Sequence, residues 1–131
     1  MYFKIMNSVR TNNFNDERIM QKISGMWKEA SNLLNNDVIK YGVYYDYESN
    51  YKGDYTLAVA IETSSDQAQL QILDDSKYEV FKVDAEDEHG ILNTWKAIWE
   101  REDRRVLQRA YTYDFEKYNP DGTIEIHIAV K

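Results

Sequence analysis

Cysteine is absent from this chain of 131 residues, and proline, glycine and histidine are scarce. Without cysteine there are no disulfides, no thiolate nucleophiles and no cysteine-bound metals, a pattern typical of a reducing compartment. No apolar run approaches the length that crosses a bilayer, and segment 1–10 is too short and too mixed for a signal peptide. We therefore expect a cytoplasmic protein that does not enter a membrane.

Positive charge is also in short supply, with 16 Lys and Arg against 23 Asp and Glu and a formal net charge of -7. Nucleic-acid affinity depends on clustered basic residues, so direct binding to DNA or RNA is not expected and cationic partners are favoured. The two histidines, His89 and His127, lack the spacing of metal ligands, and no glycine-rich phosphate loop is present. We expect no metal and no cofactor.

An internal repeat is the strongest positive feature of the sequence. A Trp-Lys pair begins at Trp27 and again at Trp95, and the tetrapeptides YDYE and YDFE begin at Tyr45 and Tyr113, so both pairs are separated by 68 positions. Self-similarity at a fixed spacing indicates a duplicated structural unit. We predict one domain over 1–131, with repeat 1 at about 1–63, a connector at 64–76 and repeat 2 at about 77–131.

Hydrophobic periodicity predicts the elements of each repeat. Alternating residues predict strands near 2–10, 41–48 and 55–62 in the first half, and over 78–84, 110–118 and 123–130 in the second. Helical spacing predicts helices over 16–34 and 88–103, and segment 69–73 is a candidate for a short extra strand. The fold class is therefore α+β: duplicated β-α-β-β modules with pseudo-twofold symmetry, antiparallel sheets, two main helices and a central ligand cleft.

Strand alternation assigns side chains to the two sheet faces. The apolar series Leu57, Val59, Ile61 and its counterpart Ile124, Ile126, Ile128 is expected to face the helices, with Val43, Tyr45, Tyr47 and Tyr113 on the same side. The opposite, helix-free face is then expected to be polar.

That helix-free face has two interpretations. It is either open to solvent, as antiparallel sheets packed on one side usually are, with Asp46, Asp114 and Glu125 in water, or a groove for a lipophilic cation. Aromatic rings around a partly desolvated carboxylate attract such a cation. Trp27 and Trp95 also suit a purely structural role in the core, and Glu48 suits a charge at a hairpin mouth. The candidate ligand-binding residues are Glu116, Tyr118, Trp95, Trp99, Glu48 and Tyr44.

The segment RAYTYDFEKYNPDGTIEIHIAV resembles the C-terminal part of GyrI-like small-molecule-binding domains, also called AraC-type or integron-associated effector-binding domains. LNTWKAIWE is similar to the tryptophan-bearing helix that precedes it in that family. The resemblance implies two β-α-β-β modules around a central cleft, and a buried glutamate, here Glu116, that meets hydrophobic cations beside Tyr118 and Trp95 or Trp99. Ala129 departs from the proline that such domains often carry near the end.

Many relatives are fused to a DNA-binding helix-turn-helix module, whereas strand-like residues begin here at Tyr2, so we expect a stand-alone domain. The first hypothesis is an effector-binding protein in transcriptional regulation or drug sensing, which would act on DNA only through a DNA-binding or other protein partner. The second is a small hydrolase of reactive cyclopropane-bearing compounds, in which Glu116 would be catalytic. The third is a module that inhibits a protein partner through its acidic surface.

Overall fold

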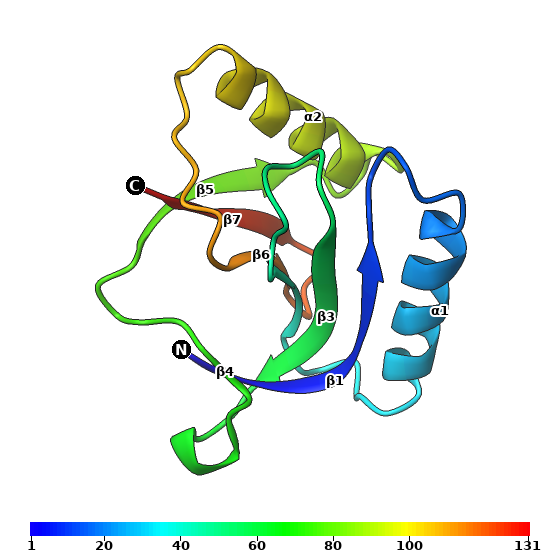
Figure 1. Cartoon of the computed structure of the whole chain (residues 1–131). Coiled ribbons are helices and arrows are strands. Elements are labelled where there is room, and N and C mark those ends of the chain that lie inside the picture. Colours follow the sequence, from blue (N-terminus) through cyan, green and yellow to red (C-terminus); the bar gives the residue numbers. More distant parts are fainter.

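The computed structural model describes residues 1–131 and contains two α-helices, one short 3-10 helix and seven strands (Figure 1). No helix is long and apolar enough to span a membrane. Both α-helices begin later in the sequence than expected, and α1 also ends earlier. The elements in chain order are β1 Tyr2–Thr11, α1 Ile19–Ser31, β2 Lys40–Tyr45, β3 Tyr55–Glu62, η1 Ser65–Gln67, β4 Leu70–Gln71, β5 Lys77–Val83, α2 Gly90–Asp103, β6 Asp114–Tyr118 and β7 Ile124–Val130.

All seven strands form one curled antiparallel sheet in the order β4-β1-β3-β2-β6-β7-β5 (Figure 1). The β-α-β-β order holds in both halves, and the α+β class is confirmed. The halves join where β2 pairs with β6, so each contributes three strands on its own side of that seam. The expected short strand in the connector is β4, which pairs with the start of β1.

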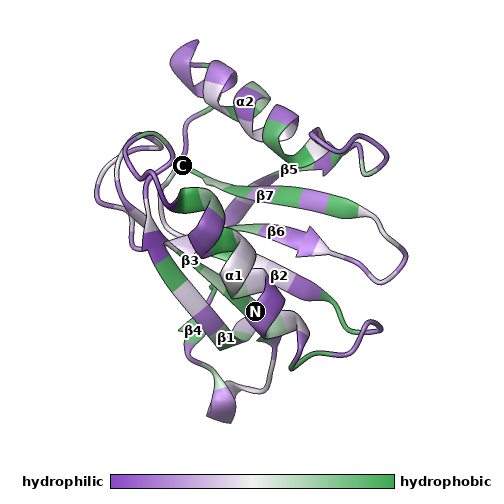
Figure 2. Cartoon of the chain, turned by 90° about the vertical axis from the view of Figure 1, so that its right-hand side faces the viewer, coloured by the Kyte–Doolittle hydropathy of each residue, from purple (hydrophilic) through white to green (hydrophobic).

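Both α-helices pack on the same face of the sheet (Figure 2). Met26 and Ala30 of α1 pack on Leu57 and Val59 of β3. Trp95 and Ile98 of α2 pack on Ile126 and Ile128 of β7. The apolar series expected to face the helices does so, because alternate residues of a strand project to one face.

The opposite, helix-free face is a second core, so the expectation that it is polar was wrong. Phe3, Tyr41, Val43 and Phe115 are buried there, and the connector covers them with Ile72. The error lies in the register. Val43 pairs with Ala58 and Tyr44 pairs with Leu57, so it is Tyr44 that shares the helix-bearing face. Alternation fixes which residues of a strand belong together but leaves open which set faces the helices.

Left-handed backbone ends the regular alternation beside both tyrosine-rich strands. Asp46 has φ 53° and Tyr111 has φ 55°, values that few residues other than glycine adopt. β2 therefore stops at Tyr45, and Tyr47 turns toward the helix-bearing face, where it packs with the α1 cluster. β6 begins only at Asp114. The expected strands 41–48 and 110–118 were both too long at this end.

Candidate functional site

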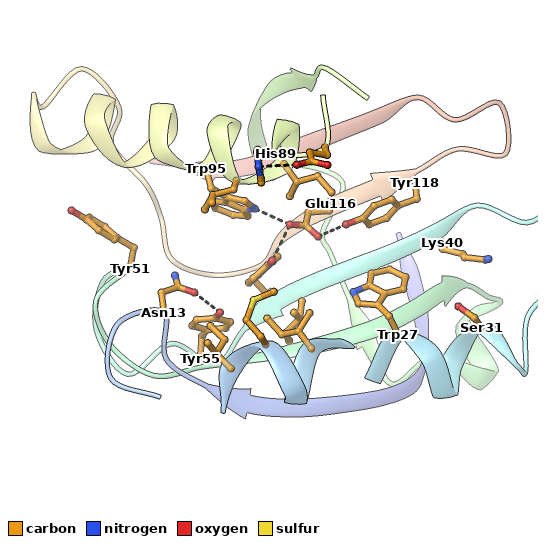
Figure 3. A pocket seen from close by; sticks show the side chains of 18 of the residues that line it. Asn13, Trp27, Ser31, Lys40, Tyr51, Tyr55, His89, Trp95, Glu116 and Tyr118 are labelled. Atoms are coloured by element: carbon orange, nitrogen blue, oxygen red, sulfur yellow. Dashed lines mark hydrogen bonds and ion pairs between the residues drawn. The ribbon is translucent and has the colours of Figure 1, made fainter. Parts of the chain in front are cut away.

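A cavity of about 780 Å³ lies between α1 and α2, above the seam of the two repeats (Figure 3). Its floor comes from β2, β3 and β6, and its walls come from the two helices. We call it the interhelical cleft. The lining residues used below are Trp27, Tyr44, Tyr51, Tyr55, Leu57, His89, Trp95, Trp99, Arg109, Glu116 and Tyr118.

Glu116 lies at the centre of the cleft floor, in the middle of β6, with only 3% of its surface exposed. Trp95 Nε1 donates a hydrogen bond of 2.7 Å to Oε2, and the Tyr44 hydroxyl donates one of 2.9 Å to the same oxygen. The Tyr118 hydroxyl donates one of 2.7 Å to Oε1. These donors come from β2, β6 and α2, and Figure 3 shows the Trp95 and Tyr118 side chains pointing at the Glu116 carboxylate.

The three donors are neutral, and Glu116 takes part in no salt bridge. Burial raises the pKa of Glu116, and the hydrogen bonds from Trp95, Tyr118 and Tyr44 oppose that rise only in part. Burial, with Glu116 nearby, also holds the pKa of Tyr44 and Tyr118 well above the usual tyrosine value, so both remain neutral donors. A negative charge on this carboxylate is therefore poorly compensated by the protein itself.

Asp114, two residues earlier on the same face of β6, has a different environment. It is fully buried, and Arg109 Nη2 lies 2.7 Å from its Oδ2. The Tyr47 hydroxyl donates to the same oxygen, and the Ala129 backbone N–H donates to Oδ1 at 2.7 Å. Asp114 is therefore a structural ion-pair partner, and its solvent interpretation was wrong.

Aromatic rings surround the Glu116 carboxylate on several sides. Tyr44 and Trp95 meet edge to face with ring centroids 5.0 Å apart, and Trp27 and Tyr118 do the same at 5.0 Å. The ring series continues along α2, where Trp99 lies 6.4 Å from Trp95. Aromatic faces carry negative electrostatic potential, and these rings bring that potential to the walls around the carboxylate.

The far end of the cleft is closed by a loop that precedes β3. Tyr51 of this loop stacks on Trp99 with ring centroids 5.3 Å apart and planes 8° apart, and its hydroxyl donates to Asp103. Phe14 packs against both rings. The cleft lining thus includes both the central carboxylate and this aromatic end.

Five of the six predicted site residues lie together in the interhelical cleft: Glu116, Tyr118, Trp95, Trp99 and Tyr44. The cleft opens on the helix-bearing face, whereas the groove interpretation, one of two that the sequence left open, placed it on the helix-free face. The cause is the same register error that misplaced Tyr44.

Glu48 does not belong to the cleft. It is exposed in the loop after β2, where its N–H bonds the Asp54 carbonyl at 2.8 Å. Glu116 lies within β6, whereas Glu48 lies beyond the end of β2, so the two similar tetrapeptides do not occupy equivalent structural positions.

Sequence reasoning missed Arg109 and treated Trp27 only as a core residue. Trp27 matches Trp95 at the spacing of the repeat, and this signal could have placed both tryptophans at one site. Arg109 lies outside every regular strand, in an isolated bridge with Val130, and no sequence pattern marks it.

A curled antiparallel sheet with two helices on one face and a buried glutamate among aromatic rings agrees with what the resemblance to effector-binding domains implies. The family model described as Cass2, integron-associated effector binding protein, matches residues 5–130. The chain belongs to this family, and the GyrI-like resemblance is confirmed.

Among solved structures, the chain is similar to an integron cassette protein from the mobile metagenome of Vibrio cholerae. The two are 27% identical, with a TM-score of 0.70 over 98% of this chain and 94% of that one. None of the curated proteins matches the sequence.

Proposed function

We propose that the interhelical cleft binds hydrophobic organic cations and that Glu116 is their charge partner. The observation that carries this proposal is the environment of its carboxylate: it is buried and hydrogen-bonded by three neutral groups, and it has no cationic partner. A protein that buries a carboxylate in this way destabilises itself, unless a ligand supplies the missing positive charge.

The shape of the site supports an apolar ligand with a localised charge. Asp114 shows how this fold neutralises a buried carboxylate for structural purposes, with an arginine and a backbone N–H. Glu116 has neither, and the space next to it is open and lined by aromatic rings. A ligand that fits would place its cationic group at Glu116 and its rings along Trp95 and Trp99.

We further propose that binding serves drug sensing or transcriptional regulation. The net charge of -7 disfavours direct contact with DNA, so this role requires a DNA-binding or other protein partner. Ligand-dependent ordering of Tyr51 and α2 around the cleft would give such a partner a surface that differs between the free and bound protein.

The test is a thermal-shift screen of the wild type and Glu116→Gln against lipophilic cations and neutral analogues of the same shape. A ligand that binds only the native state raises the melting temperature. We expect cations to raise it in the wild type and neutral analogues to do so far less, and we expect Glu116→Gln to lose the difference. Equal shifts for cations and neutral analogues would refute a charge-directed site. No shift with any compound, from a folded protein, would favour the acidic-surface hypothesis.

Hydrolysis in the same cleft is a second candidate, favoured by the raised pKa of Glu116, since a carboxyl with a raised pKa suits general acid-base work. Incubation with an electrophilic cyclopropane-bearing substrate tests it. Turnover that disappears in Glu116→Gln would make the protein an enzyme, whereas binding without turnover leaves only the effector role.

A further inference from the structure

The outer edge of β5 is unpaired along its whole length. β5 forms a ladder with β7 on one side, and none of its backbone groups is bonded on the other. Alternate residues of Lys77–Val83 therefore present free N–H and C=O groups at the end of the sheet. An unpaired edge of this length is a template for another strand.

The corresponding strand of the first repeat, β1, is protected. β4 pairs with its first residues, and the Ile5 N–H donates to Gln69 Oε1 at 2.7 Å. Further along, Lys22 Nζ donates to the Arg10 carbonyl at 3.0 Å. The outer edges of β1 and β5 occupy equivalent places in the two repeats. The edge of β1 is covered by β4 and side chains, whereas the edge of β5 has no covering element.

The side chains of β5 combine an exposed apolar residue with charges of both signs. Val80 is 49% exposed on the helix-free face. On the helix-bearing face, a groove of about 610 Å³ runs between β5 and α2, with Glu79, Phe81 and Arg101 on its sides. The Arg101 guanidinium lies 5.3 Å from the centre of the Phe81 ring.

We propose that β5 pairs antiparallel with β5 of a second copy of this chain, with Val80 opposite Val80. Residues directly opposite each other in an antiparallel pair point to the same face of the sheet, whereas consecutive residues point to opposite faces. The two-fold axis between two copies of β5 must therefore pass beside a residue that faces its own counterpart, not between two consecutive residues. Val80 is the middle residue of Lys77–Val83, so only this centre pairs all seven residues of β5, whereas a centre on Tyr78 would pair only Lys77–Glu79. Centring the pairing on Glu79 or Lys82 would set like charges against each other, and centring it on Phe81 would bring two Arg101 side chains together.

The Val80 centre instead gives complementary contacts. Each Glu79 lies opposite Phe81 of the other copy. The Arg101 guanidinium of that copy lies over the same Phe81 ring, so Glu79 of each copy forms an ion pair with Arg101 of the other. On the other face, Lys82 lies opposite Tyr78 and the two Val80 side chains bury each other. The charge pattern of the strand therefore selects a second copy, in one register, over an arbitrary extended peptide.

The contact is a single short strand plus the side chains beside it, well below the interface size of obligate dimers. We expect the dimer to dissociate on dilution, and the measurement must cover a range of concentrations. Sedimentation velocity of the full chain, from micromolar to millimolar, should show a monomer–dimer equilibrium. A wild type that stays monomeric throughout overturns the proposal, and an extended-peptide partner would then be the remaining occupant of this edge.

Three variants test the register. Val80→Lys should raise the dimer dissociation constant by about tenfold or more, because two ammonium groups would meet at the centre. Glu79→Arg should also weaken the dimer, and the double change Glu79→Arg with Arg101→Glu should restore it. Val106→Lys, at an apolar residue that is 64% exposed outside this strand, is the matched control and should leave the dimer unchanged. A dimer that survives Val80→Lys, or a double variant no better than Glu79→Arg, contradicts the pairing.

Discussion

Asp114 and Glu116 lie two residues apart on one face of β6, both buried, and only Asp114 has a cation beside it. The Arg109 guanidinium that pairs with Asp114 lies over the Trp95 ring, 5.8 Å from its centre, and the indole N–H of the same ring donates to Glu116. The same strand therefore holds one carboxylate that stabilises the fold and one that the fold leaves uncompensated. This difference supports a structural role for Asp114 and the proposed ligand-binding role for Glu116.

Neutralising these two carboxylates should change stability in opposite directions. Asp114→Asn breaks a buried ion pair and is expected to lower the free energy of unfolding by about 3 kcal/mol. Glu116→Gln removes a buried charge without a partner and should leave the free energy of unfolding equal or higher at neutral pH. Chemical denaturation of the three proteins measures both changes. A large loss of stability in Glu116→Gln would mean that Glu116 is a structural residue.

The element order and the helix-facing core could be predicted from the sequence, because they follow from local periodicity. Leu57 and Val59, like Ile126 and Ile128, alternate along their strands and pack against the helices as expected. The face of β2 could not be predicted in this way. Whether Val43 or Tyr44 faces the helices is decided by pairing with β3, which is a contact between separate segments.

The sequence identified most of the residues that line the cleft but not the face of the sheet on which the cleft lies. Glu116 and the aromatic residues near it were found because a family pattern and an internal repeat mark them. Glu48 was misassigned because the repeat of letters continues past Tyr45, whereas the left-handed Asp46 ends the strand. Arg109 was missed since its role depends on the burial of Asp114, and no local pattern shows that burial.

Cation binding should strengthen with rising pH through the raised pKa of Glu116, because only the ionised carboxylate attracts the ligand. Stability of the free protein should change in the opposite direction over the same window. The folded state holds this proton more tightly than the unfolded state, so the free energy of unfolding falls as pH rises from the unfolded pKa to the folded one.

Isothermal titration at a series of pH values checks the binding half of this prediction. Glu116→Gln should bind weakly at every pH. His89→Gln, a change at a second titratable residue lining the cleft, should keep the wild-type profile. If His89→Gln flattens the profile and Glu116→Gln does not, Glu116 is not the group that controls binding.

Trp95→Phe should shift the pH profile of binding to higher pH. The change keeps an aromatic ring but removes the N–H that donates a hydrogen bond of 2.7 Å to Glu116. The pKa of Glu116 should therefore rise further. Trp99→Phe is the control, since this residue stacks on Tyr51 and makes no hydrogen bond to the carboxylate. It should weaken binding without moving the midpoint. Equal midpoint shifts in both variants would show that ring packing, not the hydrogen bond, sets the pKa.

Gly42, the cross-strand partner of Glu116, should tolerate no side chain without loss of binding. A Cβ at this position would lie 3.1 Å from Glu116 Oε1 and 3.3 Å from the ring of Trp27. The carboxylate is held by three hydrogen bonds and the ring is packed on Tyr118, so neither can move aside freely. Gly42→Ala should therefore weaken cation binding and lower the free energy of unfolding by about 1 kcal/mol.

Gly25→Ala provides the matched control for this change. Gly25 lies within α1 with nothing within 4 Å of an added Cβ, so alanine should raise the free energy of unfolding by about 0.5 to 1 kcal/mol through helix propensity. Its cation affinity should equal that of the wild type. Denaturation and titration of both variants then separate a general effect of a methyl group from displacement of Glu116. Wild-type affinity in Gly42→Ala would mean that the ligand does not need the carboxylate in its present position, and the charge-directed cleft would have to be abandoned.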